Sequence, residues 1–258
     1  NYVFVGIRQA GKSYLLYQRI QQLIEEGHSI EEMLYINFDD ERLRQFTTHD
    51  FDLILQAYAS MFNLRPILFF DEIQNIEGWE NFARRLANQK YNVYITGSNA
   101  KMLSREIATT LGGRYWNADV YPYSFFEYLK AKNITLATNW MYGKQSAEVS
   151  KLFNDYFSFG GFPELVDIIA KRAWLNDIYS KIFFSDLIVR NKIRNEEAMG
   201  LLVKRLAEGV KQPVSHTRLA NLISTAGIKI SKATIIDFIK YLKESCLLFP
   251  LENYAAKF

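Results

Sequence analysis

The sequence predicts an α/β protein whose first part folds around a parallel β-sheet and whose second part is mostly helical. Three observations predict this class. Short runs of β-branched and aromatic residues alternate with helix-like periodicity over roughly the first 120 residues, which is typical of three-layer α/β domains. A glycine-containing loop joins the first of these runs to an amphipathic stretch. Beyond residue 121 the apolar residues recur mainly at helical spacing.

The first part contains five candidate strands. They are residues 2–5, 33–38, 67–70 and 92–96 and, as the fifth, a segment within 114–120. Residues 12–26 place Leu16, Ile20 and Leu23 on one helical face, and Gly27 is a favourable residue to end that helix. A second stripe of helical spacing consists of Trp79, Phe82, Ala83 and Leu86. We interpret both stripes as the core-facing sides of crossover helices.

The composition changes after the fifth candidate strand. An aromatic cluster occupies residues 121–128, and helical periodicity follows over 146–210. Two glycines and a proline within residues 159–163 predict a break in that helical region. We therefore expect three regions, namely a phosphate-loop core at 1–125, a helical linker or lid at 126–170 and a helical, winged-helix-like domain at 171–258.

The last region predicts a helix, a tight turn and a second helix. Ser215 can cap the first helix, which ends at Gly227, and Ser231 can cap the second. A strand is expected after the second helix, before residue 250. This arrangement suits a DNA-reading helix pair, and it equally suits a winged-helix scaffold used for packing or protein contacts.

Composition excludes several classes of protein. The chain has 258 residues, of which 49% are hydrophobic and 23% charged, so it is neither disordered nor collagen-like. The single cysteine, Cys246, forms no intrachain disulfide, which favours a reducing compartment and hence the cytoplasm. No apolar run approaches the roughly 18 residues that span a bilayer, and residues 1–30 lack a signal-peptide pattern, so we expect no membrane association.

The ends and the charges of the chain carry two further expectations. The chain starts at Asn1 and stops at Phe258 within an aromatic stretch, so we expect it to be part of a longer protein. Residues 1–170 contain 16 Lys and Arg against 20 Asp and Glu, whereas residues 171–258 contain 15 against 8. A basic block suits a DNA or acidic protein partner, although solvated lysines on a helical domain give the same count.

A phosphate-binding loop is the strongest motif. Residues 6–13 read GIRQAGKS, match GxxxxGK[ST], follow an apolar strand and open a helix. The glycines let the backbone approach a polyphosphate so that amide groups and the helix N-terminus face it. Lys12 is the expected contact of the β and γ phosphates, and the Ser13 hydroxyl the expected Mg²⁺ ligand. The predicted nucleotide contacts are Gly6, Ile7, Arg8, Gln9, Ala10, Gly11, Lys12, Ser13 and Tyr14.

Two carboxylates follow the third candidate strand. The run ILFFDE places Asp71 and Glu72 at the carboxyl edge of a buried strand, where α/β sheets bind ligands. Neighbouring strand residues point to opposite sides, so the two acids should act differently. We expect Asp71 to hold the Mg²⁺ and Glu72 to polarise the attacking water.

Small polar residues end the fourth candidate strand, in the run ITGSN. Ser98 or Asn99 could bond the γ phosphate or the attacking water, and either could equally cap the helix beginning near residue 100. Arg114 is the first candidate for a cation at the transition state, ahead of Arg8 and Arg105. Two further acids, Asp39 and Asp40, are expected in a solvated turn rather than at the metal.

These residues carry a resemblance to a known family. In order, GIRQAGKS, LYINFDDERL, ILFFDEIQNIEGWE, YITGSNAKMLSREIATTLGGRY and VYPYSFFEYL look like bacterial and archaeal AAA-type ATPases with a C-terminal domain of unknown function. YFSFGGFPE and DLIVRNKIRN extend the match to nearly the whole chain. The resemblance implies a RecA-like additional-strand P-loop core, with the Ser98 strand between the phosphate-loop and Glu72 strands. It also implies a winged helix and a further C-terminal portion beyond this chain.

The leading functional hypothesis is therefore an Mg²⁺-dependent ATPase of the AAA type whose cellular role the sequence does not give. The alternative is a nucleotide-gated switch that binds DNA or protein through residues 171–258, with hydrolysis only resetting its state. ATP is preferred over GTP by the resemblance alone, and oligomerisation stays open. Other chemistries fit poorly, because His28, His49 and His216 are scattered and no metal-ligand spacing or nucleophile elbow occurs.

Overall fold

The computed structural model describes residues 1–98, 109–210 and 212–251. It divides into two compact units, Asn1–Ala173 and Trp174–Phe258. None of the described helices is both long enough and apolar enough to cross a membrane.

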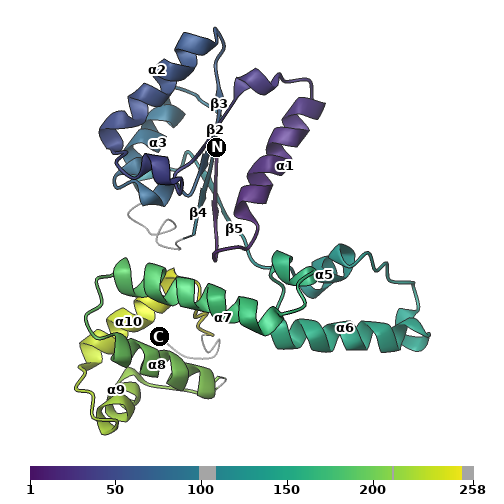
Figure 1. Cartoon of the computed structure of the whole chain (residues 1–258), viewed down its shortest axis with the longest axis vertical. Coiled ribbons are helices and arrows are strands. Elements are labelled where there is room, and N and C mark those ends of the chain that lie inside the picture. The colour runs from purple at the N-terminus through teal and green to yellow at the C-terminus, as the bar shows by residue number, and fades with distance from the viewer. Residues whose placement is uncertain (99–108, 211, 252–258) are drawn as a thin grey trace. The chain divides into compact units, whose positions relative to one another are not determined.

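Unit 1 is built on a five-stranded parallel sheet with the order β2-β3-β4-β1-β5 (Figure 1). The strands are β1 (Tyr2–Val5), β2 (Met33–Asn37), β3 (Ile67–Asp71), β4 (Val93–Gly97) and β5 (Trp116–Asp119). Every pair is parallel. The predicted α/β class is confirmed, and so is the additional strand, because β4 lies between β1 and β3.

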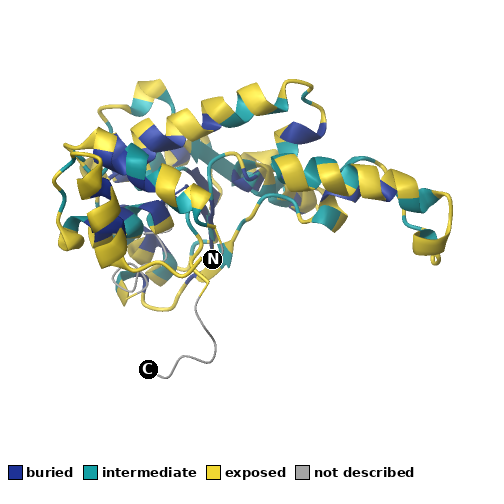
Figure 2. Cartoon of the chain, turned by 90° about the horizontal axis from the view of Figure 1, so that it is seen from below, coloured by how far each residue is buried: buried dark blue, intermediate teal, exposed yellow. Residues whose placement is uncertain are grey.

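Helices cover both faces of this sheet. Helix α1 (Lys12–Glu25) lies on one face, and α2 (Phe51–Met61) and α3 (Trp79–Asn88) lie on the other (Figure 1). The alternation along β3 explains this layering, because Leu68 and Phe70 pack in the cluster of α2 and α3 while Phe69 packs with Leu16 of α1. Both faces of β3 are therefore buried, as its unbroken apolar run requires. Figure 2 colours the buried residues of the chain dark blue.

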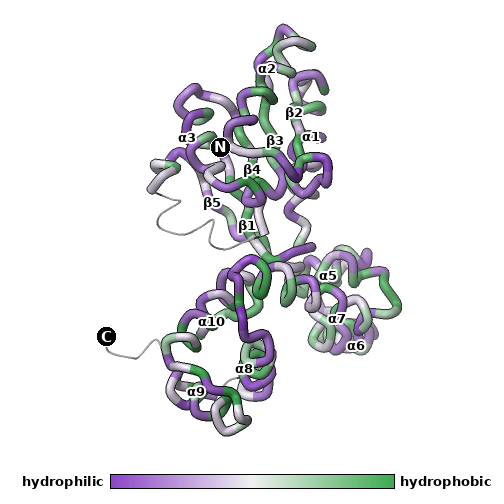
Figure 3. Tube along the Cα trace, turned by 60° about the vertical axis from the view of Figure 1, so that its left-hand side comes forward, coloured by the Kyte–Doolittle hydropathy of each residue, from purple (hydrophilic) through white to green (hydrophobic). Residues whose placement is uncertain are grey.

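The predicted apolar stripes match the two cores. The stripe on α3 is buried at all four positions, Trp79, Phe82, Ala83 and Leu86. On α1, Leu16 and Leu23 are buried and Ile20 packs against the same cluster. The strands that these helices cover are also hydrophobic, and Figure 3 shows β1, β3 and β4 largely in green. Short helical turns complete the sheet layer, namely η1 (Ile30–Glu32), η2 (Glu41–Leu43), η3 (Thr48–Asp50) and η4 (Ile73–Asn75).

A small helical segment completes unit 1. Helix α5 (Phe125–Ala131) starts with a capping box between Ser124 and Glu127, and α6 (Gln145–Phe159) follows after η6 (Trp140–Tyr142). Helix α6 ends at the predicted break, where η7 (Pro163–Val166) begins. A Cβ on Gly161 would collide with the Tyr123 carbonyl, so glycine is required at that contact.

All of the regular secondary structure in the described residues of unit 2 is helical. It continues α7 (Lys171–Lys181) and contains the π-helical segment η8 (Ile182–Val189), then α8 (Glu196–Glu208), α9 (His216–Thr225) and α10 (Lys232–Glu244). One apolar cluster joins η8 to the last three helices. The predicted helix, turn and helix are present, with Ser215 and Ser231 as N-caps.

The strand expected after α10 is not found in the described part of the chain. Residues 245–251 form a turn and an extended tail without strand pairing. A strand is stable only when another strand pairs with it, and no described residue of unit 2 forms one. A wing therefore does not accompany the two helices within the described residues.

Candidate functional site

The loop between β1 and α1 is shaped for a close backbone approach. Gly11 and Gln9 adopt left-handed conformations, with φ of 97° and 59°. A Cβ on Gly6 would collide with the Val120 carbonyl, so only glycine fits there. Because its N-cap is a glycine, α1 starts without a side-chain acceptor for its first amide groups. Such a helix start attracts an anion.

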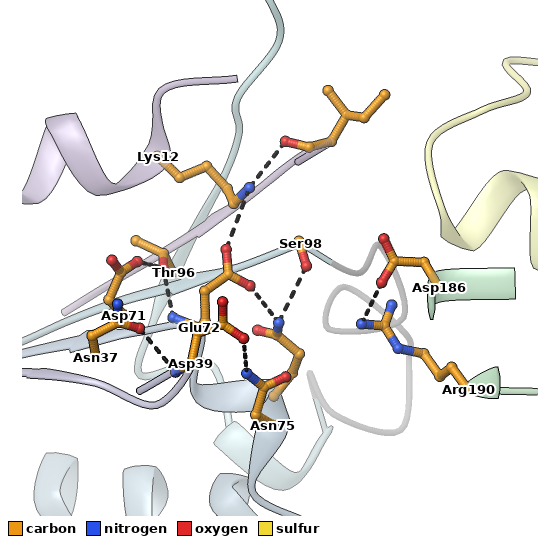
Figure 4. A network of polar contacts seen from close by, with 12 residues as sticks. Lys12, Asn37, Asp39, Asp71, Glu72, Asn75, Thr96, Ser98, Asp186 and Arg190 are labelled. Atoms are coloured by element: carbon orange, nitrogen blue, oxygen red, sulfur yellow. Dashed lines mark hydrogen bonds and ion pairs between the residues drawn. The ribbon is translucent and has the colours of Figure 1, made fainter. Parts of the chain in front are cut away.

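Lys12 is held beneath this loop. Its side chain is almost fully buried, with 2% exposed. Its Nζ donates to the Ile7 carbonyl at 3.0 Å and lies 3.8 Å from Oε1 of Glu72 (Figure 4). The loop cation and the strand-edge carboxylate therefore lie within ion-pair distance of each other, beside the loop that the motif assigns to the phosphates.

Asp71 is buried at the carboxyl end of β3, with 2% of its surface exposed. Both of its oxygens accept hydrogen bonds, Oδ2 from the Tyr35 hydroxyl at 2.8 Å and Oδ1 from the Thr96 hydroxyl. Burial, together with hydrogen bonds to Tyr17 and Asp71, raises the pKa of Tyr35, so this hydroxyl stays protonated and donates. Two hydroxyls thus hold one carboxylate rotamer at the site.

Thr96 links the two acids. Its Oγ1 donates to Asp71 and accepts from the Glu72 amide at 3.0 Å. Glu72 itself has a left-handed backbone, with φ 52° and ψ 40°, which a residue other than glycine adopts only at a cost of about 1–3 kcal/mol. This conformation ends β3 abruptly and starts η4. The alternation expected of neighbouring strand residues does not apply here, because Glu72 lies beyond β3, and its left-handed backbone gives the two carboxylates different partners.

Glu72 and Ser98 share a contact that the sequence analysis did not predict. Gln74 Nε2 donates to Oε2 of Glu72 at 2.5 Å and to Oγ of Ser98 at 3.2 Å. Ser98 is 2% exposed and directly follows β4. The phosphate-binding loop and the carboxyl ends of β3 and β4 therefore meet at one end of the sheet, as Figure 4 shows.

Most of the remaining residues predicted for the site lie in the loop, at the start of α1 or in a turn after β2. Ser13 is half-buried in the first turn of α1 and Tyr14 is exposed beside it, while Ile7 and Arg8 are half-buried in the loop and Ala10 is buried. Asn99 and Arg105 lie outside the described residues.

Asp40 caps η2 and bonds to Arg42, whose hydrogen bonds lower the pKa of the Asp40 carboxyl to about 2. Asp39 is exposed and accepts from Asn75 at 3.3 Å, so both acids belong to a turn.

The structure does not bring Arg114 to these residues. Strand β5 runs parallel to β1, with Trp116 beside Tyr2 and Asp119 beside Val5. Arg114 precedes β5 and so lies at the amino edge of the sheet, about 13 Å of strand away from the loop at the carboxyl edge. Its guanidinium is exposed and donates to the Gly112 carbonyl at 3.3 Å.

The residues that are brought together fit a triphosphate with its magnesium ion. The uncapped start of α1 and the Lys12 ammonium offer donors and positive charge to an anion. Asp71 and the Ser13 hydroxyl offer the oxygen ligands that Mg²⁺ prefers. Among these groups, the proximity of Lys12 and Glu72 is the feature that distinguishes the site from a glycine-rich turn.

Comparisons with known proteins show which families and proteins this chain is similar to. A family model described as an AAA domain matches residues 1–129, and one described as a domain of unknown function (DUF8612) matches residues 150–258. An uncharacterized protein of Methanocaldococcus jannaschii is 35% identical over 99% of the chain, and one of Haemophilus influenzae is 32% identical over 98%. The chain spans only 57% and 62% of those two proteins.

Two solved structures are similar at low identity. An Aeropyrum pernix Orc1 protein in complex with DNA is 14% identical with a TM-score of 0.41, the match covering 95% of this chain and 78% of that one. Cdc6p from Pyrobaculum aerophilum is 12% identical with a TM-score of 0.40, the match covering 94% and 79%.

Proposed function

Because the chain belongs to the AAA domain family, we propose that it binds ATP with Mg²⁺ and hydrolyses it. The observation that carries the proposal is the 3.8 Å approach of Lys12 to Glu72, between a helix start and a strand edge. A loop that only bound phosphate would need the lysine and no carboxylate facing it. A hydrolase needs both, because water must be activated beside the terminal phosphate.

Each residue of the site has a part in this proposal. The amides of residues 6–14 and the Lys12 ammonium bind the phosphates. Ser13 and Asp71 hold Mg²⁺, which neutralises phosphate charge when bound. Glu72 takes a proton from the water as its oxygen attacks the γ phosphorus and the bond to the departing diphosphate breaks. Ser98 shares the Gln74 amide with Glu72, which supports a contact of its hydroxyl with the terminal phosphate or the water.

Phosphate release tests this function directly. We expect the purified chain to release phosphate from ATP with Mg²⁺ and to lose that activity when EDTA removes the metal. Ser13→Ala should raise the Mg²⁺ concentration needed for half-maximal rate, whereas Ser60→Ala, an exposed serine at the far end of α2, should leave it unchanged. A folded chain that binds Mg-ATP without releasing phosphate would overturn the hydrolase and leave a binding protein.

A second candidate function rests on the helix pair of unit 2. Ser231 caps α10, and Lys229 and Lys232 are exposed on either side of that cap. The N-terminal end of a second helix is where helix-turn-helix proteins meet base edges, and lysines there also suit phosphate contacts. We propose DNA as the partner of this surface, with nucleotide turnover resetting the bound state.

Salt dependence tests the DNA proposal. Binding of a fluorescent duplex should weaken steeply between 50 and 200 mM salt, because about one counterion is released for each phosphate contacted. Lys232→Glu should weaken binding by about tenfold. Lys204→Glu, an exposed lysine on α8, serves as the matched charge control. Absence of binding at low salt, or equal effects of both substitutions, would leave α9 and α10 as a packing or protein-contact scaffold.

A further inference from the structure

Gln74 occupies the centre of the site although no phosphate-loop or strand-edge motif includes it. The left-handed backbone of Glu72 changes the direction of the chain at the end of β3, and η4 begins directly after it. The amide nitrogen of Gln74 then reaches Glu72 at 2.5 Å and Ser98 at 3.2 Å. One side chain therefore ties the β3 edge to the β4 edge.

The carbonyl oxygen of the same side chain is buried without a hydrogen-bond partner, alone among the side-chain polar atoms of the described residues. The amide cannot be reversed to relieve this, because a carboxylate accepts only and Glu72 requires the NH₂ group. A buried acceptor without a donor costs about 1–3 kcal/mol. Such an atom in a native protein calls for a ligand or a water that supplies the donor.

We propose that Gln74 orients the attacking water together with Glu72, an inference that rests on the hydrolase function proposed above. A water has two hydrogens. One is directed to the Glu72 carboxylate, which takes the proton, and the other to Oε1 of Gln74, so that the oxygen lone pair points at the γ phosphorus. The Nε2 bond keeps Glu72 in the required rotamer. The described hydrogen bonds of Gln74 go to Glu72 and Ser98 and not to the phosphate loop, so we expect its loss to affect hydrolysis more than nucleotide binding.

Gln74→Met tests the inference, because methionine keeps the length of the side chain and removes both hydrogen-bonding groups. We expect kcat to fall about 10- to 100-fold while the Kd for Mg-ATP changes by less than about twofold. Asn75→Ala is the matched control, since Asn75 occupies the same turn and its side-chain amide donates to the Phe38 carbonyl and to Asp39. Its kcat should stay at the wild-type value.

A binding measurement separates orientation of the water from a structural effect. ADP with aluminium fluoride resembles the transition state and should raise the Tm of the wild type more than ADP alone does. In Gln74→Met the extra rise should disappear while the rise with ADP persists. If methionine prevents folding, Gln74→Asn replaces it, because its shorter amide does not bridge Glu72 and Ser98.

The outcomes distinguish this inference from the proposed function. A wild type that binds Mg-ATP but never hydrolyses it overturns both. A hydrolysing wild type with an equally active Gln74→Met variant, or a variant that loses affinity for Mg-ATP together with kcat, overturns only the role of Gln74. Loss of kcat and of the extra Tm rise, with Kd retained, supports it.

Discussion

Glu72→Gln should lower the rate of ATP hydrolysis by about 10²- to 10⁴-fold, the usual contribution of a general base. Nucleotide binding should persist and tighten. The carboxylate lies 3.8 Å from the Lys12 ammonium, where we expect it to compete with a phosphate for that cation and to repel the phosphate charge. Glutamine removes the negative charge and keeps the shape, so both penalties to binding disappear while the base is lost.

Single-turnover phosphate release and equilibrium binding of a fluorescent ATP analogue measure these two effects separately. Glu77→Gln is the matched control, because Glu77 is exposed, lies five residues further along and has no ion pair among the described residues. Equal hydrolysis rates for Glu72→Gln and wild type would remove Glu72 from the chemistry. Weaker ATP binding by the variant would contradict the competition for Lys12.

The sheet and its loop could be predicted because their signals are local. An unbroken apolar run followed by two acids gives β3 and its carboxyl edge, and glycines before a helical stripe give the loop and α1. The expected strand after α10 failed for the opposite reason. A strand depends on a partner elsewhere in the chain, which the apolar residues 247–249 cannot reveal.

The contacts that arrange the acids depend on register between strands, and so could not be predicted. Asn37 pairs with Asp71 and Ile95 with Phe70, which brings Tyr35 and Thr96 to the same carboxylate. Tyr35 lies 36 residues before its acceptor. A tyrosine within an apolar strand and a threonine at a strand end carry no sign of that meeting in the sequence.

Arg114 and Gln74 illustrate the same limit. The sequence made Arg114 the first candidate for the transition-state cation, but the parallel pairing of β5 with β1 puts Arg114 at the opposite edge of the sheet. Gln74 follows Glu72 by two positions, and its side chain would lie away from Glu72 and Ser98 if Glu72 had an extended backbone. Only the left-handed turn at Glu72 brings the glutamine amide under Ser98.

Lys12→Ala should weaken Mg-ATP binding by about 10- to 150-fold, which corresponds to the 1.5–3 kcal/mol of a hydrogen bond to a charged group. The substitution should perturb the fold little, because the Glu72 side chain retains its bond to Gln74 and is 18% exposed to solvent. Isothermal titration measures the affinity, and the Tm without nucleotide reports the fold. Lys130→Ala, an exposed lysine on α5, should bind as the wild type does.

The double substitution separates the two charges. If Glu72 weakens binding only by competing for Lys12, then Glu72→Gln should tighten Mg-ATP binding in the wild type and have less effect when Lys12 is already alanine. The difference between the two effects is the coupling energy of the pair. Additive effects would mean that Glu72 acts on the phosphates directly. An unchanged Kd for folded Lys12→Ala would mean that the loop does not hold the triphosphate, and the proposed ATPase would fail with it.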